Sequence, residues 1–577
     1  MTDTGDTTAP RRIWRVDLAL LLRVCIAVAI ALSLHLVLTQ EINWDEFFYL
    51  SQVHSYLRGD LNLPLQTIHV HFWNWLALTG QDEIGQIRIA RVILWLVQCG
   101  TIWALYRLAR EFFDDIPALF TLLVYLSFDY VLVNGTSYRT DTTAVFFLMV
   151  SLVVLLGPLS VWRMGLFCLL VALAGLVTVK VIFYAPAYIG LALWRVMNAG
   201  HRWRMVLRLA IMVVGTFAVF AALYFAHKAS LPGGDNAAAG RMLSGGARIT
   251  LMETGLFPRL DYMYLTALYA PVSVVLVAAG ALVVLFGGRG LSGGWRAVPV
   301  LILLALPLGS FVFYRNAFPY YYAFILPPAM LLAGAVMAGF DRHRAVQSGL
   351  AVLVTITIVF SWRALPEQGL AHQARTIEAV HRMFPEPVAY FDRSKIIASF
   401  PQAGFFMTSW GMSGYVKGGR AVLQEAMKEQ AVPLLLLNSP HLVAAVAPDA
   451  RQPRQSLLDA DRKALAGNYI PHWGVIWVAG KSLSLTGEDQ TIEILVPGPY
   501  TVEGDAPVVM DGREYAPGDV VTLTRGPHMA GGLGEVVLRW GDHLFRPEAP
   551  APAPPFFKGF RPSPNAMSQD RGTAESP

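Results

Sequence analysis

Charged residues are scarce in this 577-residue chain, where Asp, Glu, Lys and Arg make up 15% against 55% hydrophobic residues. Soluble domains carry about 25% charged residues, so this balance excludes an ordinary soluble protein. Cysteine is scarce as well. The cysteines, Cys25, Cys99 and Cys168, lie far apart within apolar runs, which excludes a disulfide framework and a cysteine-based zinc site. The net charge of +5 is modest, and we expect no nucleic-acid partner.

The apolar residues gather in long runs, and the mean hydropathy is +0.47. A helix needs about 20 predominantly apolar residues to cross the hydrocarbon core of a bilayer. The runs predict about eleven membrane-spanning helices, and we expect the first to be retained rather than cleaved as a signal peptide. The expected spans are 18–40, 88–107, 116–134, 141–158, 163–180, 181–197, 205–227, 262–287, 297–314, 319–340 and 345–363.

Basic residues are concentrated in every second connection between these spans. Positive charge stays on the cytoplasmic side of a membrane, which places residues 1–15 in the cytoplasm. The long connection 41–87 and everything after residue 363 are then outside. We therefore expect a multi-pass protein of a bacterial inner (plasma) membrane, surrounded by membrane lipids, with its outer parts in the periplasm. The basic connections carry Arg107, Arg110, Arg163, Arg195, Arg202, Arg204, Arg208, Arg289, Arg296, Arg342 and Arg344.

The character of the sequence changes near residue 364. Short apolar strand patterns alternate with helical stretches, which predicts an α/β domain at 364–486. Strand patterns separated by turn residues such as Asp511-Gly512 predict a small β-sandwich at 487–546. The segment 547–577 is rich in Pro, Ala and Ser, and we expect it to be disordered. The predicted fold class is a mainly α polytopic membrane protein with a C-terminal periplasmic α/β and β-sandwich part.

Two adjacent carboxylates, Asp45 and Glu46, follow the first expected span in a loop rich in aromatic residues. Carboxylates at a membrane boundary are costly unless they are solvated, paired or used. In a sugar transfer, one carboxylate can take the proton from the acceptor hydroxyl. Asp45 is the candidate base, and Glu46 is a supporting or metal-facing partner. The alternative is an acidic cap on a helix along the membrane surface.

Three more ionisable residues are expected at the same outer boundary. A short turn between two spans carries Arg139 and Asp141, and Lys180 interrupts the apolar block 163–197. Arg139 can pair with a carboxylate or a phosphate. Asp141 can bind sugar hydroxyls, orient the base or accept a metal, and Lys180 can hold a lipid phosphate. The alternatives are an Arg–Asp pair, a helix cap made by Asp141 and a lysine that snorkels to the surface.

An arginine and a run of tyrosines stand at the outer junction of two further spans. Arg315 suits a phosphate because a guanidinium is always charged and offers several donors. Tyr320 and Tyr321 can stack on a sugar, or they can belong to the aromatic belt at the lipid headgroups.

A histidine pair, His69 and His71, lies in the long outer connection. In an extended segment both side chains would point the same way. Together with Asp45 and Glu46 they could bind a divalent metal. We expect no other cofactor.

These residues resemble the pattern of the GT-C glycosyltransferases, with the nearest likeness to the protein O-mannosyltransferase and lipid A aminoarabinose transferase branch. The likeness covers about residues 15–363 and rests on four segments. They are the acidic pair after the first span, Arg139 to Asp141, Gly175 to Lys180, and Arg315 to Tyr322 running into Pro327-Pro328.

The resemblance implies a GT-C catalytic domain at 16–363, a polyprenyl-phosphate sugar donor and inversion of the anomeric centre. It also implies that Asp45, or less well Glu46, is the base, and that Lys180 and Arg315 face the carrier phosphate. Many members have a Pro-rich stretch where this chain reads Thr67 to His71. The C-terminal part does not resemble the sugar-binding repeats of eukaryotic mannosyltransferases, so a protein acceptor is not implied.

We therefore expect a glycosyltransferase that moves a monosaccharide to an envelope glycan, lipid or protein acceptor on the periplasmic face. Two other classes stay open: a transporter or flippase of lipid-linked sugars, and a non-enzymatic envelope assembly protein. A transporter would place charges near the bilayer midplane, often within inverted repeats. Here the expected ionisable residues gather at one face, and no repeat is evident.

Overall fold

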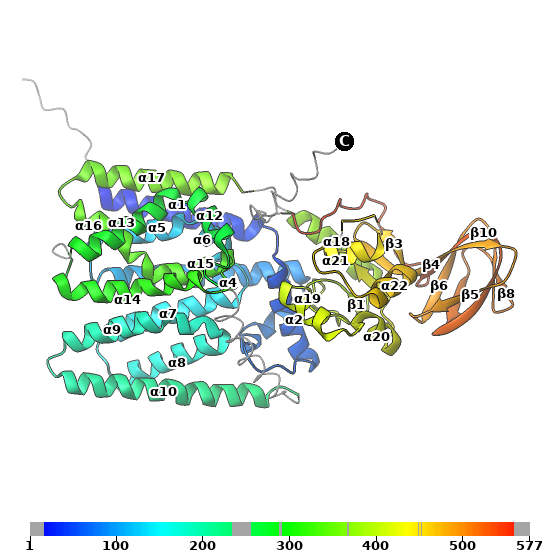
Figure 1. The fold of residues 1–577 in the computed structure, drawn as a ribbon, viewed down its shortest axis with the longest axis horizontal. Helices are drawn as coiled ribbons and strands as arrows, with labels where there is room; N and C mark the ends of the chain where they lie inside the picture. The colour runs from blue at the N-terminus through cyan, green and yellow to red at the C-terminus, as the bar shows by residue number, and fades with distance from the viewer. Residues whose placement is uncertain are drawn as a thin grey trace, which may run out of the picture.

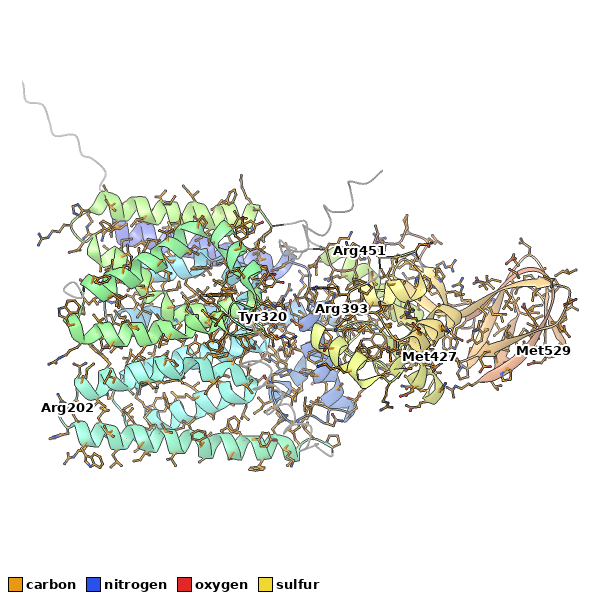
Figure 2. The ribbon with its side chains drawn as sticks, viewed as in Figure 1. Arg202, Tyr320, Arg393, Met427, Arg451 and Met529 are labelled. Atoms are coloured by element: carbon orange, nitrogen blue, oxygen red, sulfur yellow. The ribbon has the colours of Figure 1, made fainter. Side chains whose placement is uncertain are left out.

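The structure is a computed structural model that describes residues 17–232, 255–287, 291–365, 369–447, 449–451 and 453–558. A bundle of long helices and a C-terminal part that carries the strands lie end to end (Figure 1). Arg202 and Tyr320 mark opposite ends of the bundle, and Tyr320 is at the end that faces the C-terminal part (Figure 2). The expected cytoplasmic segment 1–15 lies outside the described residues.

The described residues contain six helices that are long and apolar enough to cross a membrane, or up to eight if each bent helix pair is one span. Three further apolar helices are shorter, so the count of eleven stays a prediction. The bundle helices are α1 (Leu18–Thr39), α4 (Glu83–Ala109), α5 (Asp115–Ser127), α6 (Asp129–Asn134), α7 (Thr140–Leu156), α8 (Val161–Val177), α9 (Ala185–Met197), α10 (Arg202–Ala229), α12 (Leu260–Tyr269), α13 (Pro271–Gly287), α14 (Ala297–Gly309), α15 (Pro319–Ala329), α16 (Leu331–Gly339) and α17 (Arg344–Arg363).

The outer faces of the bundle are apolar. Helix α10 exposes Val214, Phe217 and Phe225. Only 6% of its most apolar stretch of 18 residues is buried within the protein. Water would make such a face costly, whereas lipid tails would not. The bundle is therefore built for a membrane, as the composition predicted.

The long connection 41–87 forms α2 (Trp44–Arg58), α3 (Val70–Trp73) and the 3-10 helix η1 (Asn74–Thr79) between the bundle and the C-terminal part (Figure 1). Helix α2 begins with a capping box: the Asn43 side chain accepts from the Asp45 N–H, and Glu46 accepts from the Asn43 N–H. The sequence analysis gave such a helix as the alternative, and its place along a membrane surface stays a prediction. The segment around His69 and His71 turns into α3 instead of being extended, so the condition under which both side chains would point the same way is not met.

The C-terminal part begins with α18 (Leu370–Met383) and contains a parallel pair, β1 (Tyr390–Phe391) and β2 (Leu434–Leu436). Strand β2 pairs with β4, and β4 pairs over most of its length with β10. Strands β4 and β10 connect the strands before residue 486 with the strands after it. The domain boundaries at 364, 486 and 546 therefore stay predictions. The remaining elements are α19 (Ser409–Gly418), α20 (Val422–Glu429), α21 (Pro440–Val446), α22 (Asp459–Asn468), β3 (Tyr469–Trp473), β4 (Ile476–Thr486), β5 (Gln490–Ile494), β6 (Gly498–Gly504), β7 (Val508–Met510), β8 (Arg513–Tyr515), β9 (Val520–Leu523) and β10 (Gly526–Trp540).

The segment after β10 returns to the bundle. Phe556 is buried against Phe47 of α2 and His372 of α18, and the Lys558 N–H donates to both carboxylate oxygens of Glu41 at 3.0 Å. The predicted disorder from residue 547 is therefore wrong for residues 547–558. Aromatic partners from distant segments order this Pro-rich stretch, and its composition alone did not show them. Residues 559–577 lie outside the described residues.

Candidate functional site

Glu46 forms a closed ion pair with Arg91 of α4. Arg91 donates to both Glu46 oxygens at 2.6 and 2.8 Å, and these side chains are only 1% and 3% exposed. The Tyr138 N–H also donates to Glu46 at 2.7 Å. Burial opposes the charge of Glu46, but Arg91 and the donated hydrogen bonds outweigh it, so the pKa of Glu46 lies below its usual range. These contacts join α2, α4 and the turn before α7.

Asp45, one residue earlier, belongs to a separate network with Arg139, Asp141 and Lys180. Arg139 Nη1 donates to Asp45, and Arg139 Nε lies 3.6 Å from Asp141 Oδ2. Lys180 Nζ donates to Asp141 Oδ1 at 2.6 Å. The Asp45 side chain is 18% exposed, against 4% for Arg139, 5% for Asp141 and 14% for Lys180. Asp45 is therefore the most open member of the network.

The tyrosine run supplies one wall of this network. The Tyr320 ring centroid lies 3.5 Å from Arg139 Cζ and 4.9 Å from Lys180 Nζ, so both cations face the ring. The Tyr321 hydroxyl is 2.6 Å from Ser310 Oγ, and its ring is 5.9 Å from Lys180 Nζ. Of these two tyrosines, Tyr320 is the one that packs directly on the charged groups.

A pocket lies beside the network. Its lining includes the polar residues Gln98, Thr101 and Asn134 and the apolar residues Ala323 and Phe324. The pocket therefore offers both charged and apolar walls to a ligand. Its complete lining is Gln98, Thr101, Tyr125, Asn134, Gly135, Arg139, Asp141, Thr142, Val145, Tyr320, Ala323 and Phe324.

The histidines do not join this network. The His69 ring is buried edge-on against Tyr49, and burial lowers the pKa of His69 to about 4. His71 Nε2 instead pairs with His227 Nδ1 of α10 at 2.8 Å. Within the described ranges, no group of three or more His, Cys, Asp and Glu residues could hold a metal ion. The four residues suggested for a divalent metal, Asp45, Glu46, His69 and His71, do not come together.

Arg315 lies in the loop before α15, five residues ahead of Tyr320, and its carbonyl accepts from Arg259 Nε at 3.3 Å. The sequence prediction missed two other arginines near the site. Arg91 could have been found, because an arginine inside an apolar run needs a partner. Arg393, whose guanidinium lies 4.5 Å from the Trp44 ring centroid, comes from a distant C-terminal loop and carried no such signal.

No protein-family model matches the chain, and no curated protein matches its sequence. Solved structures do match. ArnT from Cupriavidus metallidurans bound to undecaprenyl phosphate has a TM-score of 0.51 and 14% identity, covering 75% of this chain and 96% of that one. ArnT is a GT-C superfamily member. The chain has the GT-C fold.

The apo state of ArnT from Cupriavidus metallidurans matches this chain with a TM-score of 0.52 and 14% identity, covering 79% of this chain and 97% of that one. The archaeal oligosaccharyltransferase AglB from Archaeoglobus fulgidus, in complex with an inhibitory peptide and a dolichol-phosphate, has a TM-score of 0.49 and 10% identity, with 91% and 97% coverage. The two ArnT matches confirm, for the fold, the resemblance to GT-C proteins predicted from the sequence.

Proposed function

We propose that this chain is an inverting glycosyltransferase that takes a monosaccharide from a polyprenyl-phosphate carrier and transfers it to an envelope glycan or lipid. The observation that carries the proposal is the network of Asp45, Arg139, Asp141 and Lys180 at one end of a GT-C fold. It contains an accessible carboxylate and two cations beside a pocket. An outer, periplasmic orientation of this end follows from the arginine distribution and is part of the proposal.

In the proposed reaction, Asp45 takes the proton of the acceptor hydroxyl. The acceptor oxygen forms a bond to the anomeric carbon of the donor sugar while the bond from that carbon to the phosphate oxygen breaks. The electron pair leaves with the polyprenyl phosphate, and attack from the opposite side inverts the centre. A positioned general base of this kind contributes about 10²–10⁴-fold to the rate.

The carrier phosphate is proposed to bind at Lys180, beside Arg139 on the same Tyr320 ring, with Arg315 as a further phosphate ligand implied by the resemblance. In the structure Lys180 Nζ is paired with Asp141 Oδ1, so a phosphate would share or replace that contact. The apolar wall at Ala323 and Phe324 suits the start of a polyprenyl chain. The bound undecaprenyl phosphate in the ArnT structure supports a donor of this class.

The contacts of Glu46 favour a structural role over a catalytic one. Its carboxylate already accepts from Arg91, Tyr138 and Asn43, which leaves little capacity to take a proton from a substrate. The transporter alternative is less well supported, because the network lies at one end of the bundle and not halfway along it (Figure 2).

The deciding experiment has two stages. Mass spectrometry of envelope glycans, with and without the protein, identifies the transferred sugar and its acceptor. Purified full-length protein is then assayed with the corresponding polyprenyl-phosphate sugar. Asp45→Asn should lower the transfer rate about 10²–10⁴-fold while the donor still binds.

The matched control is Asp459→Asn, an exposed carboxylate of α22 that pairs only with Arg462 in the described residues. It should transfer at the wild-type rate. Unchanged transfer by Asp45→Asn, or movement of the intact lipid-linked sugar across vesicles without transfer, would overturn the proposal.

A further inference from the structure

A second polar cluster lies on the C-terminal part, at the carboxyl ends of the parallel strands β1 and β2. Asp392 and Arg393 follow β1 directly, and Asn438 comes shortly after β2. In α/β sheets, ligands bind outside the carboxyl ends of parallel strands. Arg393 lies on the side of the C-terminal part that faces the bundle, across the junction from Tyr320 (Figure 2). This edge therefore faces the candidate site.

The backbone of Arg393 is fixed on both sides. Its N–H donates to Asn438 Oδ1 at 2.9 Å, and its carbonyl accepts from the Met407 N–H at 2.9 Å. The fold therefore fixes the backbone from which this side chain projects.

The neighbouring residue Asp392 organises the turn that carries Arg393. Its buried carboxylate accepts from the N–H groups of Lys395 and Ile396, and from the side chains of Gln402 and Asn438. Lys395 has φ +59°, in the left-handed region that side chains other than glycine rarely adopt. Such backbone strain persists only where surrounding contacts enforce it, and it concentrates at functional sites.

The guanidinium of Arg393 is the group without a polar partner. It packs on the Trp44 ring at 4.5 Å, directly beside Asp45 in sequence, and it donates no hydrogen bond to any described residue. Its Nε is buried and unpartnered, as is Nδ1 of the nearby His441. Burial lowers the pKa of both residues. Because buried polar groups are almost always paired, the unpartnered Nε donor of Arg393 points to a missing ligand.

We propose that Arg393 and its turn form an acceptor subsite for an anionic oxygen group, either a phosphate or a carboxylate, and hold the acceptor hydroxyl at Asp45. This inference rests on the proposed function. The guanidinium lies over the Trp44 ring, and its planar fork of N–H donors can bind two oxygens side by side. Asp45 forms its ion pair with Arg139 and makes none with Arg393.

The competing interpretation is that Arg393 only fastens the C-terminal part to α2 through Trp44. The two interpretations differ in what a substitution changes. A fastening contact affects stability and every kinetic constant together, whereas an acceptor subsite affects the KM for the acceptor alone.

The test uses purified full-length protein, the polyprenyl-phosphate sugar donor and an envelope extract from cells lacking the protein as the acceptor. Arg393→Gln should raise the KM for the extract about 10- to 100-fold, as expected for losing a hydrogen bond to a charged group, and leave donor binding unchanged. Arg393→Lys retains the charge without the planar fork and should give a smaller rise. Arg420→Gln, an exposed arginine on the same part, is the matched control and should change neither constant.

Inorganic phosphate and acetate, used as separate inhibitors, distinguish the two anion classes. The one that mimics the acceptor should compete with the extract in the wild type and about tenfold less well in Arg393→Gln. Thermal protection by the competing anion is the readout that needs no turnover: it should persist in Lys180→Gln and weaken in Arg393→Gln.

An unchanged KM and unchanged anion competition in Arg393→Gln would overturn this inference while leaving the proposed function intact. If Arg393→Gln is too unstable to assay, an unchanged KM in Arg393→Lys is the result that overturns it. Full transfer by Asp45→Asn would instead overturn the proposed function. Thermal protection of the protein by the competing anion would then still test whether Arg393 binds an anion.

Discussion

Two charged clusters begin one residue apart on α2, and they differ in how completely their groups are satisfied. Glu46 and Arg91 are both nearly inaccessible, and Arg91 also donates to the carbonyls of Gln40 and Glu41 at the end of α1. In the other cluster Asp45 is partly open, and Arg139 Nε and Asp141 Oδ2 lie 3.6 Å apart without a hydrogen bond. The first cluster is saturated by the protein, and the second retains capacity for a substrate.

This difference distinguishes a cluster that holds the fold together from a cluster that can take part in chemistry. A buried ion pair is favourable only if its geometry is excellent and further hydrogen bonds support it, and Arg91 makes four hydrogen bonds to Glu46, Gln40 and Glu41. A transferase needs charged groups that are held in position and can still form hydrogen bonds with the substrate. Adjacent residues of the same chemical type thus acquire different roles from their surroundings.

The largest expected effect is on stability, from Glu46→Gln. It leaves Arg91 buried without its counter-charge, which should cost about 3–5 kcal/mol and lower the thermal unfolding midpoint in detergent. Asp45→Asn, at a partly open position, should shift the midpoint far less. Equal midpoints for these two variants would contradict the distinction between a saturated and an open cluster.

The next effect is on donor binding, from Lys180→Gln. Losing a hydrogen bond from a charged donor should weaken polyprenyl-phosphate binding by about 1.5–3 kcal/mol, measured as a dissociation constant in detergent. Arg202→Gln, at the opposite end of the bundle (Figure 2), is the control and should bind the lipid as the wild type does. Equal weakening by both substitutions would indicate a general charge effect and not a site.

A smaller effect concerns pH and the junction between the two parts. His381 of α18 pairs with Glu83 of α4 at 2.8 Å. Burial opposes the charge of His381, but Glu83 outweighs it, so the pKa of His381 is raised. The folded state then favours the charged ring. Its stabilising contribution is full below the unfolded pKa of about 6.5 and is lost as pH rises through the raised folded value.

The unfolding midpoint should therefore fall between about pH 6 and about pH 9 by more in the wild type than in His381→Gln. His543→Gln, an exposed histidine beside Asp542, serves as the control and should retain the wild-type pH dependence. Identical pH dependence in the wild type and His381→Gln would exclude this contribution.

The smallest effect comes from the exposed pair Arg420–Glu425 of the C-terminal part, whose side chains are 74% and 39% exposed. Arg420→Gln should leave the unfolding midpoint unchanged, because solvent screens such pairs. Comparison with Glu46→Gln then isolates burial as the variable, since both variants remove one member of an Arg–Glu pair. A loss comparable to that of Glu46→Gln would refute this explanation.

Local sequence patterns predicted much of the helical part. Apolar runs located the bundle helices, and the break near Lys180 appears where α8 ends and the short 3-10 helix before α9 begins. The strand patterns near 390, 434 and 476 likewise correspond to β1, β2 and β4. These features depend on neighbours in sequence, so periodicity and length are sufficient to find them.

The site could be predicted only in part. The sequence placed Asp45, Arg139, Asp141 and Lys180 at one boundary, and the structure brings them together. The sequence preferred Asp45 to Glu46 as the base but did not show what makes the two differ, because the difference is made by Arg91 on another helix. Distant contacts also order the tail around Phe556 and bring Arg393 to Trp44, and a local pattern carries no information about such partners.

The reciprocal hydrogen bonds between Ile42 and Gln373 have a consequence for biogenesis. Ile42 N–H donates to Gln373 Oε1 at 2.8 Å, and Gln373 Nε2 donates back to the Ile42 carbonyl at 2.9 Å, across 331 residues of chain. At about 5–20 residues per second, a ribosome needs roughly 15 to 70 seconds to make that stretch. The segment that leads into Asp45 can therefore make these hydrogen bonds only after the chain has been synthesised through Gln373, beyond the last helix of the bundle.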